Sequence, residues 1–181
     1  MDDALKRLTK IAGWGAILIF LLLNFFEEPS TYSDYIGIFG QAATISSIFV
    51  LFYNRILWSI NPLEKTPRIK GQFYGTLIYE YNGTPGEKNV TVFISQTLLS
   101  TKIKFSTNET SSVSVTSKIL CENGDYFLYY TYITQPQSKA RDYNPAQYGA
   151  CRLEITSSDK LTGFYWTSSR TRGDFSLCRK V

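Results

Sequence analysis

The residue types that dominate catalytic and metal sites are scarce in this sequence of 181 residues. It has no histidine, which excludes a Ser-His-Asp or Cys-His nucleophile and any metal site built on imidazole. Its three cysteines form no C-x-x-C pair and indicate neither a metal site nor a disulfide framework. Carboxylates next to turns, such as Asp125, Asp142 and Asp174, lack the pairing that acid–base catalysis needs. We therefore predict no catalytic residue, no metal, no cofactor and no enzymatic activity.

Side chains that could bind a phosphate or stack on a base gather in the C-terminal part of the chain. From residue 66 onward there are 14 lysines and arginines against nine acidic residues, a net charge of +5. Arginine forks onto phosphates, and aromatic side chains stack on bases, so this composition suits nucleotide recognition. It also suits a basic surface that faces anionic lipid headgroups, and this alternative stays open.

Short segments of alternating polarity must position these side chains. Alternation predicts strands with one dry face and one polar face, and no strong helical period appears after residue 65. Eight strands in about 115 residues predict an all-β domain, either a sandwich or a small up-and-down barrel. We favour the barrel, because closure removes sheet edges and leaves room for one small ligand. The predicted strands lie near 69–81, 89–98, 101–107, 111–121, 126–134, 147–156, 160–168 and 173–179.

The first third of the chain has the composition of a membrane anchor. Segments 11–26 and 35–54 contain no charged residue, and about 20 apolar residues suffice to cross a bilayer as a helix. We predict spans at about 10–27 and 35–54, joined by an eight-residue linker that forces an antiparallel hairpin. A cleaved signal peptide is the alternative for the first segment, but a second span follows it at once.

Charge asymmetry orients this hairpin. The linker carries only acidic charges, whereas lysines and arginines flank the two outer ends, so the positive-inside rule places both termini in the cytoplasm. Residues 1–62 are thus predicted to form a transmembrane hairpin, and residues 66–181 a cytosolic β-barrel that binds a ligand. Sequons at Asn82, Asn89 and Asn108 raise the alternative of an inverted, glycosylated cell-surface domain. The charge bias and the unpaired cysteines favour a reducing cytosol, so we interpret the three sequons as turns.

Two local patterns accompany this layout. The first predicted strand opens with GQFYG at 71–75, and the seventh reads LTGFYWT at 161–167, followed by RTRG at 170–173. With ISQ at 94–96 and QYGA at 147–150, the chain resembles the two-transmembrane, β-strand-rich effectors of bacterial CBASS antiphage operons, the CD-NTase-associated membrane effectors. The similarity spans nearly the whole chain.

The resemblance implies a function in antiviral defence. In that family a nucleotidyltransferase, the CD-NTase, makes a cyclic dinucleotide after infection, and the β-barrel binds it. Binding drives homo-oligomerisation, and the clustered hairpins disrupt the bacterial inner membrane, so the infected cell dies before the phage matures. The expected partners are thus the cyclic dinucleotide, the lipid bilayer and further copies of the chain, with no DNA or RNA polymer.

The residues indicate where such a ligand could bind. Gly163, Tyr165 and Thr167 share one face of their strand, and we expect it to point into the pocket, because small and hydroxyl side chains leave room and offer hydrogen bonds. Tyr130 and Tyr132 are favoured on the fifth strand for the same reason, and arginines 170 and 172 are expected to meet phosphate. The predicted ligand-binding residues are Tyr130, Tyr132, Tyr165, Thr167, Arg170 and Arg172.

Two other classes of function stay open from the residues alone. A membrane-tethered carrier or sensor for a small apolar ligand would have an apolar pocket with few charges at its mouth. An interaction module would leave the second aromatic face of the fifth strand exposed as a patch.

Overall fold

The structure, a computed structural model, describes residues 3–81, 83–136 and 146–180. It divides into two compact units. The first comprises Met1–Lys65 with Thr97–Leu99, and the second Thr66–Gln96 with Ser100–Val181.

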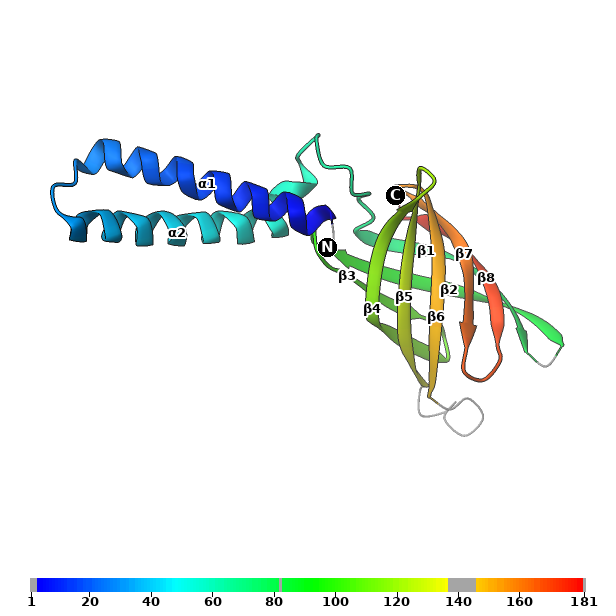
Figure 1. The fold of residues 1–181 in the computed structure, drawn as a ribbon. Helices are drawn as coiled ribbons and strands as arrows, with labels where there is room; N and C mark the ends of the chain where they lie inside the picture. The colour runs from blue at the N-terminus through cyan, green and yellow to red at the C-terminus, as the bar shows by residue number, and fades with distance from the viewer. Residues whose placement is uncertain (1–2, 82, 137–145, 181) are drawn as a thin grey trace. The chain divides into compact units, whose positions relative to one another are not determined.

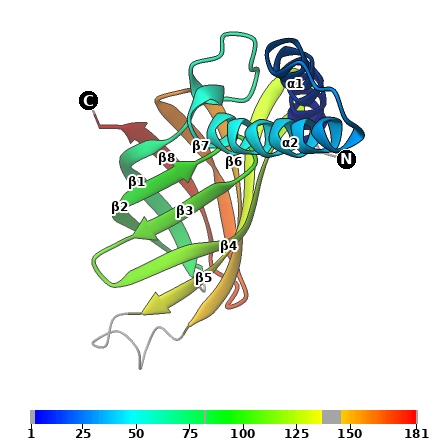
Figure 2. The same ribbon diagram turned by 90° about the vertical axis from the view of Figure 1, so that its left-hand side faces the viewer.

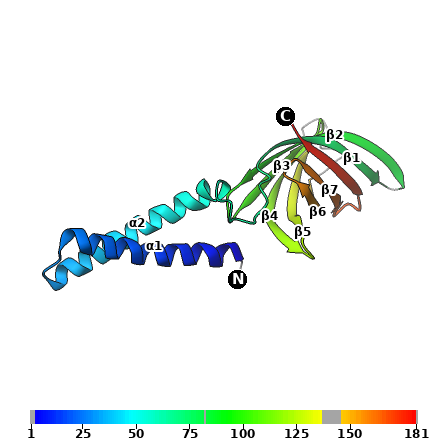
Figure 3. The same cartoon turned by 90° about the horizontal axis from the view of Figure 1, so that it is seen from above.

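Two long helices make up most of the first unit. Helix α1 covers Asp3–Glu27 and helix α2 covers Tyr32–Arg55, followed by the short 3-10 helix η1, Leu57–Ser59. Both long helices are long and apolar enough to cross a membrane, and they run side by side from the connecting turn (Figures 1 and 3). A capping box starts α2: Thr31 Oγ1 accepts from the Asp34 amide at 3.4 Å, and Asp34 Oδ2 accepts from the Thr31 amide at 2.8 Å.

One narrow stripe of α2 packs against α1. Ile38, Ala42 and Ser46, spaced by four residues, are buried, and Ser46 Oγ donates a hydrogen bond to the Ala12 carbonyl at 2.9 Å. Large apolar side chains on the remaining surface are exposed, including Phe25 at 76% and Phe39 at 67%. A helix pair that is apolar all round needs an apolar medium, so this pattern suits insertion in a bilayer.

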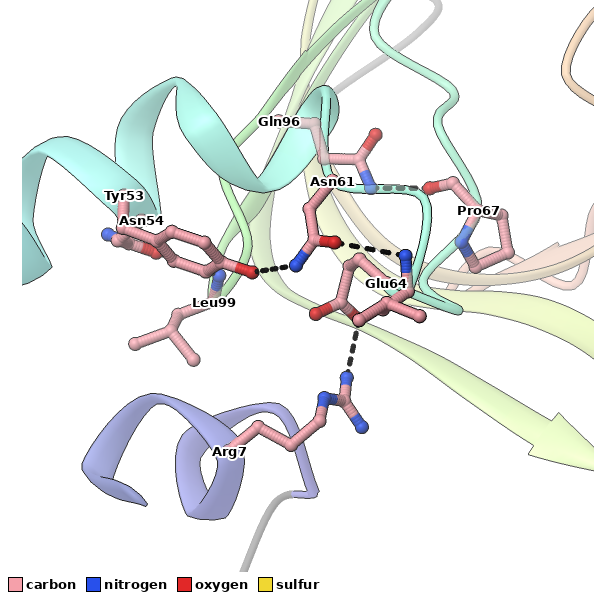
Figure 4. A network of polar contacts seen from close by, with 9 residues as sticks. Arg7, Tyr53, Asn54, Asn61, Glu64, Pro67, Gln96 and Leu99 are labelled. Carbon is pink, nitrogen blue, oxygen red and sulfur yellow. Dashed lines mark hydrogen bonds and ion pairs between the residues drawn. The ribbon is translucent and has the colours of Figure 1, made fainter. Parts of the chain in front are cut away.

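The base of the hairpin is held by a small core and a polar network. Ala4, Leu8, Tyr53, Trp58 and Leu98 form a buried cluster. Around it, Asn61 Nδ2 donates to Tyr53 Oη at 2.7 Å, and the Arg7 guanidinium pairs with Glu64 at 2.5 Å (Figure 4). Amides 98 and 99 donate to the backbone and side-chain oxygens of Asn54, which ties Thr97–Leu99 to α2.

The second unit is a closed eight-stranded antiparallel β-barrel in which each strand pairs with the next and β1 pairs with β8 (Figure 2). This confirms the predicted fold class of two N-terminal helices followed by a barrel. The strands are β1 Gly71–Tyr81, β2 Thr84–Gln96, β3 Thr101–Ser106, β4 Thr110–Glu122, β5 Asp125–Pro136, β6 Gln147–Ser157, β7 Lys160–Thr167 and β8 Arg172–Arg179.

Two details of the sequence interpretation need correction. Strand β2 begins at Thr84 rather than near residue 89, so Asn89 lies inside a strand and not in a turn. Strand β8 begins at Arg172, one residue before the start predicted near 173. In both places the strand continues beyond its apolar part, because the neighbouring strand supplies backbone hydrogen-bond partners to polar residues as well. Asn108 lies between β3 and β4, and Asn82 lies outside the described residues.

Candidate functional site

The barrel interior changes character along its length. At the end where β1 begins, inward-facing side chains such as Phe73, Leu128 and Leu161 are fully buried. Towards the other end the same strands turn polar: Leu128 gives way to Tyr130 and Tyr132 on β5, while Leu161 gives way to Gly163, Tyr165 and Thr167 on β7. The apolar end packs into a core, and the polar end leaves a cavity.

This cavity has a volume of about 390 Å³, within the range of small-molecule sites. Its described lining combines five tyrosines, seven serines and threonines, one glutamine, one ion pair and three apolar side chains. Aromatic rings and hydroxyl groups therefore face the cavity from most of the eight strands. The lining residues are Leu77, Tyr79, Tyr81, Lys88, Phe105, Thr107, Glu109, Thr110, Ser112, Tyr130, Tyr132, Thr134, Gln147, Tyr165, Thr167, Ser169, Thr171 and Phe175.

Glycines opposite the tyrosines set the positions of these rings. Gly149 is the cross-strand partner of Tyr132, and a Cβ atom on this glycine would lie 2.3 Å from the tyrosine Cζ. Gly86 bears the same relation to Tyr79, also at 2.3 Å. A tyrosine ring that covers a glycine in this way buries its face against bare backbone, which fixes the ring and keeps the space beyond it open.

The tyrosines are neutral hydrogen-bonding groups. Burial raises the pKa of Tyr130, Tyr132 and Tyr165 above the ordinary value for a phenol. Burial also raises the pKa of the neighbouring Cys151 thiol to about 12, so this cysteine is a buried thiol rather than a reactive thiolate. At neutral pH the inner wall therefore offers O–H donors without negative charge.

One ion pair contributes charge to the lining. Lys88 Nζ lies 2.7 Å from Glu109 Oε2 and 5.2 Å from the centroid of the Tyr79 ring. Sequence reasoning missed both residues. Lys88 lies on the same face of β2 as the buried Val90 and Val92. Its inward direction therefore follows once β2 is known to begin at Thr84.

A hydrogen-bonded turn between β7 and β8 borders the cavity. Thr167 Oγ1 accepts from the Thr171 amide at 3.2 Å, and Ser169 Oγ donates to Gln147 Oε1 at 2.6 Å. The hydroxyl groups of this turn are thus held by one another and by β6, which keeps the rim in a defined shape.

The structure brings four of the six predicted site residues together. Tyr130, Tyr132, Tyr165 and Thr167 all line the cavity. Arg170 is exposed in the turn that borders it, with a left-handed φ of 64°. Arg172 lies on the outer face of β8, where its guanidinium pairs with Glu80 at 3.0 Å. Neither arginine is among the described lining residues.

The geometry bears on the other functional classes. An ion pair and many hydroxyl groups are a poor match for a purely apolar ligand. The outer aromatic face of β5 is covered: the Arg152 guanidinium lies 3.7 Å above the Phe127 ring, and Arg152 Nε donates to Tyr129 Oη at 2.7 Å. Among the described residues, no group of three His, Cys, Asp or Glu side chains is placed to hold a metal ion. The arrangement is that of a binding cavity for a polar ligand with flat rings.

Comparisons with known proteins agree with this reading of the barrel. The family model described as "Cap15, cyclic dinucleotide receptor domain" matches residues 64–179. The chain is also 37% identical over 180 residues to the "CD-NTase-associated protein 15" of Staphylococcus schleiferi, a match that covers 98% of each chain.

Proposed function

The chain belongs to the Cap15 family, and from this premise we propose that it is a membrane effector of a bacterial CBASS antiphage system whose barrel cavity binds a cyclic dinucleotide made by a CD-NTase. The observation that carries the proposal is the cavity of about 390 Å³, lined by tyrosines and hydroxyl groups, inside the matched residues.

The two chemical parts of a cyclic dinucleotide suit different parts of the lining. Its bases are flat and polar at the edges, so they can stack on rings such as Tyr130 and Tyr132 while hydroxyl groups bind their edges. Tyr165 and Thr167 offer the same combination from β7. We propose these four side chains as ligand contacts.

The two phosphates of a cyclic dinucleotide require positive charge on the protein. Lys88 is the lysine among the described lining residues, and it can exchange the Glu109 carboxylate for a phosphate oxygen. Arg170 is our second candidate, because its turn borders the cavity. Arg172 lies on the outer face of β8 and pairs with Glu80, so we do not propose it as a ligand contact.

Binding must be coupled to an output at the membrane. We propose that the ligand favours an associated state of the barrel, and that the clustered hairpins then disrupt the inner membrane and kill the infected cell. A ligand shifts such an equilibrium only by its different affinities for the two states. In this proposal α1 and α2 cross the membrane with both termini in the cytoplasm, and the barrel meets its ligand there.

The proposal can be tested on the full chain in detergent micelles. We would add cyclic di-AMP, cyclic di-GMP, cyclic GMP–AMP and a cyclic trinucleotide, with AMP and GMP as controls, and follow melting temperature and particle mass together. One cyclic probe should raise the melting temperature by several degrees and raise the mass. Palmitate is included as an apolar probe. Stabilisation by palmitate alone would favour the carrier instead.

A further inference from the structure

The outer surface of three neighbouring strands carries an unusual group of side chains. The strand register aligns Glu80, Arg172 and Trp166 in one row across β1, β8 and β7. A second row aligns Ile78, Asp174 and Phe164. We call these six residues the β1–β8–β7 face.

The apolar side chains of this face are exposed in the single chain. Ile78 is 56% exposed, and the Phe164 and Trp166 rings are 43% and 49% exposed. The two rings stack, with centroids 5.9 Å apart, and they border a groove of about 680 Å³. Stacked aromatic side chains around a groove are typical of protein–protein contacts.

The charges of the face suit a second copy of the same face. Arg172 and Glu80 pair at 3.0 Å, and their side chains are 73% and 44% exposed. A surface that presents both signs side by side is self-complementary: in a two-fold contact, the arginine of each copy can meet the glutamate of the other. The face carries Glu80 and Asp174 beside Arg172, so a partner of one charge sign would match only part of it.

The face also lies directly behind the cavity. Gly173 separates Arg172 from Asp174 on β8, and it packs between the backbone of β1 and the ring of Tyr165. A Cβ atom there would clash with the Ile78 carbonyl oxygen and would lie 2.8 Å from Tyr79 Cα and 2.9 Å from Tyr165 Cε1. The ring of Tyr165, which lines the cavity, therefore lies beside the backbone that carries Arg172, and a ligand that fixes this ring also restrains this stretch of β8.

On the basis of the proposed function, we propose that the β1–β8–β7 face is the surface through which two ligand-bound copies associate. The ligand holds the Tyr165 ring against Gly173, which sets the spacing of Arg172 from Glu80 and Trp166 for the contact. Arg172 thus acts in assembly rather than in ligand binding.

A charge-swap experiment on the full chain in detergent tests this contact. With Asp174 unchanged, Glu80→Arg turns the net charge of the face positive and Arg172→Glu makes all three of its charged residues acidic, so each variant repels itself. In an equimolar mixture, every arginine can meet a glutamate of the other variant, although neither chain regains its internal pair. Lys104→Glu makes the same charge change as Arg172→Glu, but on the exposed surface of β3, and is the matched control. Each sample receives the cyclic dinucleotide that stabilises the wild type.

We expect both variants to keep the ligand-induced rise in melting temperature but to lose at least about tenfold in association, measured by particle mass. The mixture should recover most of the wild-type mass, and Lys104→Glu should behave as wild type. Normal association of the single variants would overturn the inference. A mixture that stays dissociated would overturn it as well. In either case the groove would face solvent or another protein. If no probe stabilises the wild type, the proposed function itself fails, and this inference fails with it.

Discussion

Tyr132 lies against Gly149 across the β5–β6 pair, so closely that a single methyl group on the glycine would come within 2.3 Å of the ring. The ring cannot stay in place if the glycine gains a side chain. The volume of the cavity therefore depends on the absence of a side chain at Gly149 on the neighbouring strand.

Gly149→Ala should push the Tyr132 ring into the cavity and weaken ligand binding at least about tenfold. It should also cost about 1–3 kcal/mol of stability, as overpacking does. The measurements are the dissociation constant and the free energy of unfolding. In a Tyr132→Ala background the same glycine substitution should be nearly neutral for stability, because the clash is gone. An equal cost in both backgrounds would contradict the proposed role of this contact.

The ion pair in the cavity should give opposite effects when its two partners are neutralised. Lys88→Met removes a phosphate contact and should weaken binding of a cyclic dinucleotide by about tenfold or more. Glu109→Gln frees Lys88 and removes a carboxylate that repels phosphate, so it should tighten binding a few-fold. Titration at low and high salt is the measurement, and the Lys88→Met variant should show the weaker salt dependence. Weaker binding in both variants would mean that the intact pair, not the free lysine, contacts the ligand.

The barrel should lose stability in alkali. Burial raises the pKa of Cys151 from 9.0 to about 12, so between these pH values the unfolded chain releases a proton that the folded chain keeps. The free energy of unfolding then falls by about 1.4 kcal/mol per pH unit for this one group. Above pH 10 the raised pKa of Tyr130 steepens the fall in the same direction. Unfolding from pH 7 to 11 measures the slope, and Cys151→Ala should make it shallower.

Gly40→Leu in α2 should separate ligand binding from membrane damage. Apart from the adjacent backbone of α2 itself, no atom of the described residues lies within 4 Å of a Cβ atom at this position, so leucine fits within one copy. If α2 packs closely against other copies, the larger side chain blocks that packing, and dye leakage from vesicles should fall several-fold while ligand binding stays normal. Gly13→Leu in α1 is the control, because its Cβ position is equally open. Undiminished leakage from the Gly40→Leu vesicles would rule out packing at this glycine.

Alternation in the sequence was enough to predict the number of strands and the direction of side chains inside them. Tyr165 and Thr167 follow the period of two through an apolar strand, so their shared face was visible before the fold was known. The ends of the strands were harder to predict. Polar residues near hairpins carry no apolar partner to mark the period, so the inward direction of Lys88 and the outward direction of Arg172 were not foreseen.

The register between neighbouring strands of the closed barrel lay beyond sequence reasoning. The contacts of Tyr132 with Gly149 and of Tyr165 with Gly173 depend on the register of neighbouring strands, and register follows from the whole set of cross-strand pairs rather than from one strand. Similarly, Arg152 covers Phe127 from the adjacent strand, which no pattern within β5 could indicate.

Filling the cavity is the most direct test of the central claim that the ligand binds inside the barrel. Ser112 is buried and lines the cavity, while the next residue, Val113, points outward and is 52% exposed. We would measure the dissociation constant of the stabilising cyclic dinucleotide for full-length Ser112→Trp and Val113→Trp. The account predicts that Ser112→Trp loses binding by a factor of about 100 or more and that Val113→Trp binds as the wild type does. Unchanged binding by a folded Ser112→Trp variant would contradict it.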